Sequence, residues 1–282
     1  MNIANTLLEK TRHCINEGSK LIIWPEAALP FHSLQNKNTL NYINNKLLNN
    51  TDISILSGDI TFEDDKTYNS VVLFNKDGVS KVYKKQLPVP LAEQVPLSDV
   101  FPKLKKINIG VANYSSGTED IIFEVNNQKF SSLICYESTF PGINRRHVKK
   151  GADFITFLVN DAWYTTWPEP EQHAKQSIFR AIENRRSVLR CANTGISMVI
   201  DELGINAAAA AKKAAVDGSP GTVISNGCKG LDKEFILIIP FDDIGAPNSF
   251  IIISVWSLVF IFSSITVSPS APKAAKITQD LT

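Results

Sequence analysis

The sequence has few cysteines and almost no excess charge, and both shortages exclude classes of protein. Its 282 residues include four cysteines, none of them in a CxxC pair: Cys14, Cys135, Cys191 and Cys228. Four scattered cysteines do not make a zinc site, and they are too few for a disulfide scaffold in a chain this long, so at least one free thiol is expected. The formal net charge is only +1, and no basic cluster alternates with aromatic residues. We therefore expect no nucleic-acid partner.

The N-terminal segment lacks the apolar core of a secretory signal peptide, because polar and charged residues occur throughout residues 2–19. Its apolar residues instead fall roughly on one helical face: Ile3, Leu7, Leu8, Cys14 and Ile15. The segment is therefore predicted to be a helix, with no strand before it. The overall composition, 44% hydrophobic and 20% charged, is typical of a globular protein with one large core or two smaller ones.

The middle of the chain alternates between segments typical of strands and of helices. Apolar runs predict strands at residues 20–24, 53–57, 154–159, 188–192 and 196–200. Hairpins are predicted within residues 68–83 and 121–135. Helices are predicted at residues 36–48, 144–150 and 171–186. This alternation, with hairpins added, predicts an α/β layered sandwich.

Two later segments differ from this pattern. Residues 207–215 are almost all alanine where a strand is expected, which suggests a helical or poorly ordered excursion. Residues 250–267 are apolar apart from Ser and Thr and are just long enough to cross a bilayer, so they predict a transmembrane helix, with a buried core helix as the alternative. The positive charges that follow place the C-terminus in the cytoplasm. The predicted organisation is a folded domain over residues 1–245, then the membrane helix and a short tail over residues 246–282.

Three predicted strands end in residues that together can carry out acyl transfer. Glu26, Lys85 and Cys135 each follow an apolar run. A thiol is mostly protonated at neutral pH, so Cys135 needs a base, and Glu26 is suited to that role if burial raises its pKa. Lys85 is then a cation beside the thiolate and the developing oxyanion, with the backbone N–H groups after Cys135 completing the oxyanion site.

Other pairings of these residues are less well supported by the sequence. Cys135 could pair with His147 or His173 as in papain-like enzymes, but no local pattern supports either pair. His147 lies in a basic run that predicts a solvated helix face, and His173 opens an amphipathic helix where it could cap or pack. Glu169 and Glu171 are typical of the acidic first turn of a helix. Metal binding by the dispersed histidines and cysteines is the least favoured alternative.

Several longer motifs resemble those of the apolipoprotein N-acyltransferases, a membrane-embedded branch of the nitrilase superfamily. Residues 22–30 resemble the family's glutamate motif, and residues 135–138, Cys-Tyr-Glu-Ser, resemble its nucleophile motif. Lys85 with residues 90–97 resembles its lysine and loop-glutamate segment, although Leu-Ala stands where Phe-Gly is expected. Further matches lie at residues 160–164, 172–173, 180–186 and 192–197.

The resemblance implies a nitrilase-like αββα sandwich on the periplasmic side of the bacterial inner membrane, followed by the family's C-terminal transmembrane helix. It implies an enzyme that takes a fatty acyl chain from phospholipid, holds it as a thioester, and passes it to the N-terminal cysteine amine of a diacylglyceryl apolipoprotein. By position, Glu26 is the base, Lys85 the oxyanion stabiliser and Cys135 the nucleophile. The implied supporting residues are Glu93, Tyr136 and Glu137. No metal or other cofactor is implied.

The family also has transmembrane helices and a first strand before the region that matches, so the chain is expected to be truncated at its N-terminus. Two alternative functions remain. One is a soluble nitrilase-type amidase or carbamoylase, which uses the same chemistry with water as the acceptor. The other is an inactive, membrane-anchored fragment.

Overall fold

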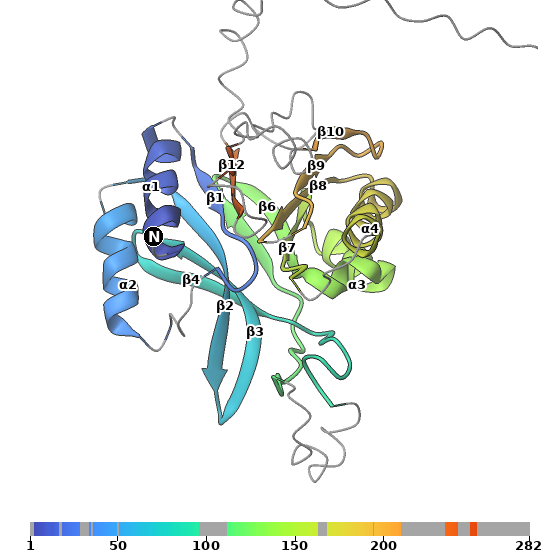
Figure 1. The fold of residues 1–282 in the computed structure, drawn as a ribbon, viewed down its shortest axis with the longest axis horizontal. Coiled ribbons are helices and arrows are strands. Elements are labelled where there is room, and N and C mark those ends of the chain that lie inside the picture. The colour runs from blue at the N-terminus through green and yellow to red at the C-terminus, as the bar shows by residue number, and fades with distance from the viewer. Residues whose placement is uncertain are drawn as a thin grey trace, which may run out of the picture.

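Two six-stranded sheets form the centre of the described structure, a computed structural model (Figure 1). The structure describes residues 3–16, 19–28, 34, 36–49, 51–95, 112–162, 168–193, 195–209, 235–241 and 249–252. The strand order is β12-β11-β1-β2-β3-β4 in the first sheet and β10-β9-β8-β7-β6-β5 in the second.

The first sheet combines a parallel centre with an antiparallel meander. Its strands are β1 (Leu21–Ile23), β2 (Ser54–Glu63), β3 (Lys66–Asn75), β4 (Gly78–Lys84), β11 (Phe235–Phe241) and β12 (Ser249–Ile252). β1 pairs in parallel with both β2 and β11, and the remaining pairs are antiparallel. β1, β2 and β4 therefore run in one direction, and their carboxyl ends face the same edge. The long β2–β3 hairpin projects beyond the body of the molecule (Figure 1).

The second sheet contains three neighbouring parallel strands. Its strands are β5 (Ile122–Val125), β6 (Gln128–Ile134), β7 (Phe154–Val159), β8 (Ser187–Ala192), β9 (Met198–Ile200) and β10 (Asn206–Ala209). β6 pairs in parallel with β7, and β7 with β8, whereas the outer pairs are antiparallel. Residues that follow β6, β7 and β8 therefore meet at one edge, which is where open α/β sheets bind ligands.

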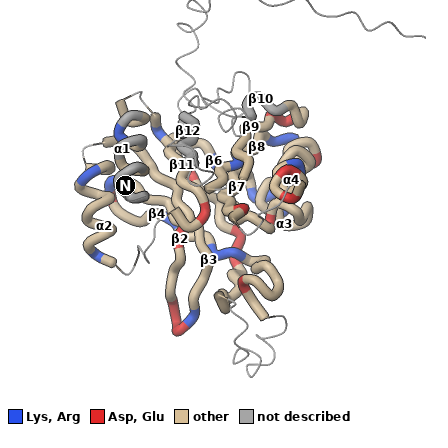
Figure 2. The backbone as a smooth tube through the Cα atoms, in the orientation of Figure 1, with Lys and Arg blue, Asp and Glu red and all other residues tan. Residues whose placement is uncertain are grey.

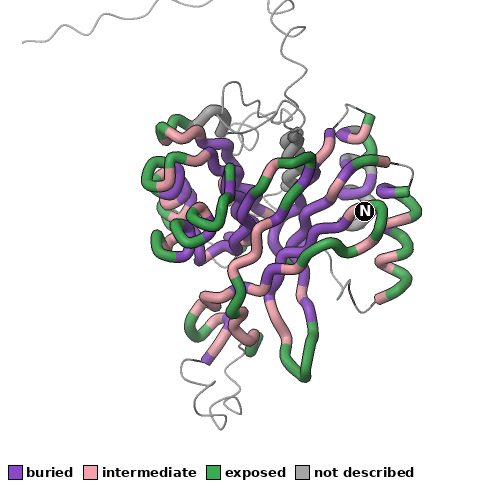
Figure 3. Tube along the Cα trace, turned by 180° about the vertical axis from the view of Figure 1, so that it is seen from behind, coloured by how far each residue is buried: buried purple, intermediate pink, exposed green. Residues whose placement is uncertain are grey.

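Helices cover the outer faces of both sheets, and the chain is an αββα sandwich, as the sequence predicted. The helices are α1 (Ile3–Asn16), α2 (Lys37–Ile43) with a following π-helical turn (Asn44–Leu48), α3 (Pro141–Lys149) and α4 (Glu169–Asn184). α1 and α2 lie beside the first sheet, and α3 and α4 beside the second (Figure 1). The exposed residues lie mainly along the helices and at the hairpin tips, while the strands are buried (Figure 3).

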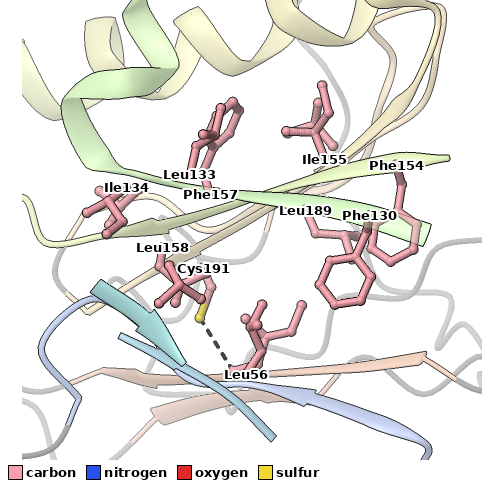
Figure 4. Close-up of a cluster of buried hydrophobic side chains, with 14 of the residues drawn as sticks. Leu56, Phe130, Leu133, Ile134, Phe154, Ile155, Phe157, Leu158, Leu189 and Cys191 are labelled. Atoms are coloured by element: carbon pink, nitrogen blue, oxygen red, sulfur yellow. Dashed lines mark hydrogen bonds between the residues drawn. The ribbon is translucent and has the colours of Figure 1, made fainter. Parts of the chain in front are cut away.

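The main core lies between the two sheets. Leu158 and Cys191 point from the second sheet toward Leu56 of the first, while Phe157 points to the helix side (Figure 4). Phe130 stacks on Phe154 with ring centroids 4.9 Å apart. A separate cluster packs α1 and α2 against the other face of the first sheet. The side chains of the second sheet in the main core have no exposed surface: Phe130, Phe154, Phe157, Leu158 and Cys191. The strands therefore lie in an apolar interior, and site residues follow at their ends.

Most predicted elements are present, with boundaries that differ by a few residues. β2 is twice as long as predicted, because it continues into a hairpin with β3. α3 begins at Pro141, since proline is well accommodated in a first helical turn where its missing N–H costs no hydrogen bond. α4 begins at Glu169 and ends at Asn184.

The alanine-rich segment differs from the prediction where it is described. Ala207, Ala208 and Ala209 belong to β10, which pairs antiparallel with β9. They form neither a helix nor a poorly ordered excursion, because the edge of the second sheet supplies hydrogen-bond partners that override the helix preference of alanine. The rest of this segment, from residue 210, lies outside the described residues.

The predicted transmembrane helix is not found in the part of the chain that the structure describes. Phe250, Ile251 and Ile252, at the start of the predicted span, form strand β12 against β11. Aromatic and β-branched residues favour extended pairing when a neighbouring strand is available. None of the described helices is long and apolar enough to cross a bilayer. Residues 253–267 lie outside the described residues, as does the tail, so the boundary predicted at residue 245 stays a prediction.

Charges of both signs are distributed over the outer elements that the structure describes (Figure 2). The tip of the β2–β3 hairpin is acidic at Glu63, Asp64 and Asp65, and Glu63 pairs with Lys84 of β4. Such exposed pairs contribute little to stability. The charged groups that matter for function are instead the buried ones.

Gly58 permits the close approach of β2 to the turn that follows β1. A Cβ atom at this position would lie 2.5 Å from Glu26 Cα and 2.7 Å from the Pro25 carbonyl oxygen. The Gly58 N–H donates to that oxygen at 3.1 Å. Ala27 adopts a left-handed φ of 50° in the same turn. The position of Glu26 therefore depends on the absence of a side chain at residue 58.

We expect Gly58→Ala to lower the free energy of unfolding by about 1–3 kcal/mol, because the new methyl group displaces backbone atoms of the Glu26 turn. Gly142→Ala is the matched control, since a Cβ there meets nothing within 4 Å and the residue is helical. The control should be neutral or slightly stabilising. Urea denaturation of both variants measures the difference, and equal stabilities would contradict this account of Gly58.

Candidate active site

Glu26 lies at the carboxyl end of β1 with its carboxylate in the interior. Pro25 ends the strand, and the residue is only 7% exposed. Asn69 of β3 donates its side-chain N–H to Glu26 Oε1 at 2.7 Å. The same amide donates to Glu93 Oε1 at 2.9 Å. Asn69, which the sequence analysis did not single out, therefore bridges two buried carboxylates.

Lys85 follows β4 and places its ammonium group between those carboxylates. Its Nζ lies 2.7 Å from Glu93 Oε2 and 4.0 Å from Glu26 Oε1, and the residue is 1% exposed. Its backbone N–H donates to the Asn69 carbonyl at 2.8 Å. Glu93 Oε2 also accepts from the Val89 N–H at 2.7 Å, so Glu93 both neutralises Lys85 and holds the loop of residues 86–93 that follows this lysine.

Cys135 ends β6 in a strained backbone conformation. It begins the 3₁₀ turn η3 (Cys135–Thr139) and has a left-handed φ of 47°. Such a conformation in a non-glycine residue costs about 1–3 kcal/mol and is typical of functional turns. The thiol is free, which confirms the sequence expectation of a free thiol. Its Sγ lies 3.9 Å from the Asn160 carbonyl oxygen at the end of β7.

The three predicted residues Glu26, Lys85 and Cys135 meet in one cavity of about 370 Å³. Its other lining residues are Val89, Ala92, Glu93, Tyr136, Thr139, Glu169, Gln172, His173 and Gln176. Two of the predicted supporting residues, Glu93 and Tyr136, are therefore in the wall. Glu169 lies in the first turn of α4, as predicted, and also reaches the wall.

Burial and mutual charge set the proton affinities of the three groups. Burial raises the pKa of Glu26 to about 7, against the opposing effect of the Lys85 ammonium. Burial alone would lower the pKa of Lys85, but Glu26, Cys135 and Glu93 together raise it, so the side chain stays an ammonium. Burial and the Glu26 charge raise the pKa of the Cys135 thiol well above its usual range. The resting site therefore holds a thiol, an ammonium and a carboxyl group that titrates near neutrality.

Glu137 does not line the cavity but joins the segments that carry Lys85 and Cys135. It is fully buried, and its Oε1 accepts from the Tyr83 hydroxyl and the Gln86 N–H, both at 2.7 Å. Its Oε2 accepts from the Ile134 N–H at 2.8 Å. Burial raises the pKa of Glu137, with these donors opposing the shift. Glu137 therefore holds β4 and the Cys135 turn together, and its supporting role in the chemistry stays a prediction.

His147 lies away from the cavity wall, and the prediction that it is solvated is wrong. The residue has no exposed surface, and its ring packs edge-on against Tyr83 at 5.7 Å. Its Nε2 lies 3.3 Å from Asp120 Oδ1. Burial lowers the pKa of His147 to about 4, despite the nearby Asp120. The basic run Arg145-Arg146 directly before His147 is typical of a solvated face, but the His147 side chain points into the interior.

His173 does reach the site, but it contacts the backbone of Cys135. Its Nε2 lies 3.1 Å from the Cys135 carbonyl oxygen and 3.0 Å from Ser138 Oγ. Its Nδ1 lies 2.7 Å from Asp161 Oδ1, and Arg190 donates to Asp161 Oδ2 at 2.9 Å. The sequence alone indicates no role for Asp161 or Arg190. Asp161 carries two signals, its position soon after a predicted strand and its place in the motif at residues 160–164.

The types of residue in this group would also allow a metal site. Cys135 Sγ, an Asp161 oxygen and a His173 ring nitrogen lie within 4.8 Å of one another. However, both Asp161 oxygens are already engaged, one by His173 and one by the Arg190 guanidinium. The Lys85 ammonium, which lies near enough to Cys135 to affect its pKa, further opposes a second cation. The group is therefore better described as a hydrogen-bonded network.

Comparison with curated proteins gives relatives with a consistent name. The chain is 32% identical over 219 residues to the apolipoprotein N-acyltransferase of Chlorobaculum tepidum, covering 67% of this chain and 40% of the relative. It is 32% identical to that of Geobacter metallireducens and 34% identical to that of Rickettsia prowazekii, covering 68% and 67% of this chain and 37% and 38% of the relatives. The predicted resemblance is confirmed. The chain spans about 40% of the length of the relatives it matches.

Solved structures of nitrilase-superfamily proteins share the fold. Nit3 of Saccharomyces cerevisiae has a TM-score of 0.55 at 20% identity, covering 72% of this chain and 78% of that chain. An amidase from Nesterenkonia sp. has a TM-score of 0.54 at 15% identity, covering 73% and 78%. Residues 2–216 match the carbon-nitrogen hydrolase family. Because that match extends over most of the sequence, the chain belongs to the carbon-nitrogen hydrolase family.

Proposed function

We propose that the chain is an N-acyltransferase that transfers a fatty acyl group from a phospholipid to the N-terminal cysteine amine of a diacylglyceryl apolipoprotein. The observation that carries the proposal is the cavity in which Cys135, the Lys85 ammonium and a Glu26 carboxyl group of pKa about 7 meet. The relatives named apolipoprotein N-acyltransferase support this choice of substrates over others with the same chemistry.

In the first half-reaction, Glu26 accepts the thiol proton as Cys135 Sγ attacks the ester carbonyl of the phospholipid. The negative charge that develops on the carbonyl oxygen is stabilised by Lys85 and by a backbone N–H that follows Cys135. Collapse of the tetrahedral intermediate breaks the ester C–O bond. The lysophospholipid leaves as an alcohol with the proton from Glu26, and the acyl group remains on sulfur as a thioester.

In the second half-reaction, the neutral amine of the acceptor attacks the thioester carbonyl. Glu26 accepts the amine proton, and the same donors stabilise the oxyanion. The C–S bond then breaks, the sulfur of Cys135 regains a proton from Glu26, and the product is an amide. The three residues return to their starting protonation states. Glu93 keeps Lys85 in place throughout, because it lies 2.7 Å from the ammonium.

We also propose that the chain acts at the bacterial inner membrane, with the described domain on the periplasmic side, because the proposed donor is a membrane lipid. Support comes from the apolar character of residues 250–267.

Hydrolysis of a small amide is the second candidate function. The fold shared with an amidase from Nesterenkonia sp. favours it, and the chemistry of the first half-reaction is the same with water as the final acceptor. The two candidates differ in the fate of the thioester: aminolysis gives an amide, whereas hydrolysis gives a free acid. An inactive, membrane-anchored fragment is the third alternative, and it predicts no acylation of Cys135.

We expect the full chain to gain one acyl group on Cys135 when it is incubated with dipalmitoyl phosphatidylethanolamine in mixed micelles. Intact-mass spectrometry should show a palmitoyl adduct that hydroxylamine removes, because thioesters are labile to it. Addition of a peptide with an S-diacylglyceryl N-terminal cysteine should discharge the adduct as an amide. Cys191→Ala, which removes another buried thiol, serves as the control and should still be acylated. An adduct that survives in Cys135→Ala would contradict the proposal, as would its absence from the wild type.

We expect the alkylation of Cys135 by iodoacetamide to accelerate as the pH rises through about 7, the pKa to which burial raises Glu26. Below that pH Glu26 is protonated and cannot accept the thiol proton, whereas above it the carboxylate can. In Glu26→Gln this pH step should disappear and the rate at pH 8 should fall about a hundredfold. Glu124→Gln, at an exposed position of β5, is the matched control and should keep the step. An unchanged pH profile in Glu26→Gln would rule out this residue as the base.

A further inference from the structure

We propose that His173 is a positioning residue that, together with Ser138, fixes the orientation of the peptide group between Cys135 and Tyr136. The proposal rests on the proposed role of Cys135 as the acyl-accepting nucleophile. It adds a function to the buried network of Asp161, His173 and Arg190, which the proposed mechanism does not otherwise use.

The carbonyl oxygen of Cys135 is held from two directions. The Ser138 hydroxyl donates to it at 2.7 Å, and His173 Nε2 lies 3.1 Å from it. A carbonyl oxygen and a carboxylate oxygen both only accept hydrogen bonds, so Nε2–H is the donor to the Cys135 carbonyl and Nδ1–H the donor to Asp161, and the ring in this arrangement carries both protons. Ser138 Oγ, whose proton is used on the carbonyl, also lies 3.0 Å from Nε2 and can accept from it. The donors thus converge on one side of this peptide group.

The orientation of that carbonyl determines where the neighbouring N–H points. The peptide group is planar and trans, so its C=O and N–H bonds point in opposite directions. The N–H of this group belongs to Tyr136, directly after Cys135, and it is the donor that the mechanism assigns to the oxyanion. Pulling the Cys135 carbonyl toward His173 and Ser138 therefore keeps the Tyr136 N–H directed to the opposite side.

The ring of His173 is itself held rigidly by a buried ion pair. Its Nδ1 lies 2.7 Å from Asp161 Oδ1, and Arg190 Nη2 donates to Asp161 Oδ2 at 2.9 Å. The side chains of Asp161 and Arg190 have no exposed surface. Arg190 Nε donates to the Ile196 carbonyl at 3.0 Å, and a Cβ atom at Gly195 would lie 2.2 Å from Asp161 Oδ2. The carboxylate therefore has little room to move.

Two amide substitutions separate the two contacts of the ring. His173→Gln places an amide N–H near the position of Nε2 and retains a donor to the Cys135 carbonyl. His173→Asn places its N–H near the position of Nδ1 and retains only the contact with Asp161. If the carbonyl contact is the one that matters, Gln should preserve acyl transfer better than Asn does. Ser138→Ala removes the other donor to the same carbonyl and should behave like His173→Asn.

The test compares two reactions of the same sulfur in the full chain. Acylation by 4-nitrophenyl butyrate, followed as a burst of 4-nitrophenolate, passes through an oxyanion, whereas alkylation by iodoacetamide does not. We expect His173→Asn and Ser138→Ala to lower the acylation rate about tenfold or more, with alkylation of Cys135 close to the wild-type rate. His173→Gln should recover most of the acylation. Lys175→Gln, at an exposed position of the same helix, is the control and should match the wild type in both reactions.

Two results would overturn the proposal. One is a fall of both reactions in the same proportion in His173→Asn, together with a lower melting temperature, because that pattern indicates only a structural role. The other is an Asn variant that acylates as well as the Gln variant. Failure of the proposed function can be distinguished from failure of this proposal. A wild type that reacts with 4-nitrophenyl butyrate but not with phospholipid contradicts only the lipid substrate. A wild type that reacts with neither ester contradicts both.

Discussion

The burial of the Lys85 ammonium is the constraint on which the rest of the site depends. An ammonium group without contact to water is unstable unless carboxylates lie beside it. Glu93 supplies the close partner at 2.7 Å, and Glu26 lies at 4.0 Å. Glu93 is therefore the carboxylate that neutralises Lys85 most directly. Glu26 is left available to accept a proton in the proposed reaction. Burial can then raise the pKa of Glu26 to about 7 without leaving the cation unpaired.

The backbone brings these groups together through local features at the ends of strands. Gly58 allows β2 to pass beneath the turn of Glu26, and Cys135 adopts a left-handed φ as β6 ends. Glu137 then ties the segment after β4 to the segment after β6 through hydrogen bonds to both. The Gly58 contact joins two strands of the first sheet, whereas the Glu137 hydrogen bonds join the two sheets, so the site is complete only when both sheets are in place. The strain at Cys135 is tolerated for the same reason, since the surrounding hydrogen bonds determine its conformation.

The sequence predicted three residues that follow apolar runs and missed those in the middle of strands. Glu26, Lys85 and Cys135 could be identified because each directly follows a run of strand-forming residues, and parallel strands bring such ends to one edge. Asn69 and Arg190 lie inside β3 and β8, where a polar residue is ordinarily read as facing solvent, and only the tertiary structure shows which carboxylates they contact. The burial of His147 on α3 could not be predicted either, because Tyr83, against which its ring packs, is distant in the sequence. Local propensity likewise could not show that Ala208 and Ala209 would pair with a neighbouring strand.

The cavity combines two charge networks that belong to different sheets and act on different parts of the nucleophile. Glu26 and Lys85 follow strands of the first sheet and line the cavity with Cys135. Asp161 and Arg190 follow or lie in strands of the second sheet, and Asp161 contacts His173, whose Nε2 lies 3.1 Å from the Cys135 carbonyl oxygen. Both networks lie close to Cys135, since an Asp161 oxygen and a His173 ring nitrogen are also within 4.8 Å of its sulfur. The proposed reaction needs both proton transfer at the sulfur and a backbone N–H directed to the oxyanion. The sandwich must therefore fix the two sheets relative to each other. The inter-sheet core around Leu56 and Leu158 therefore helps to set the distance between the two networks as well as stabilising the fold.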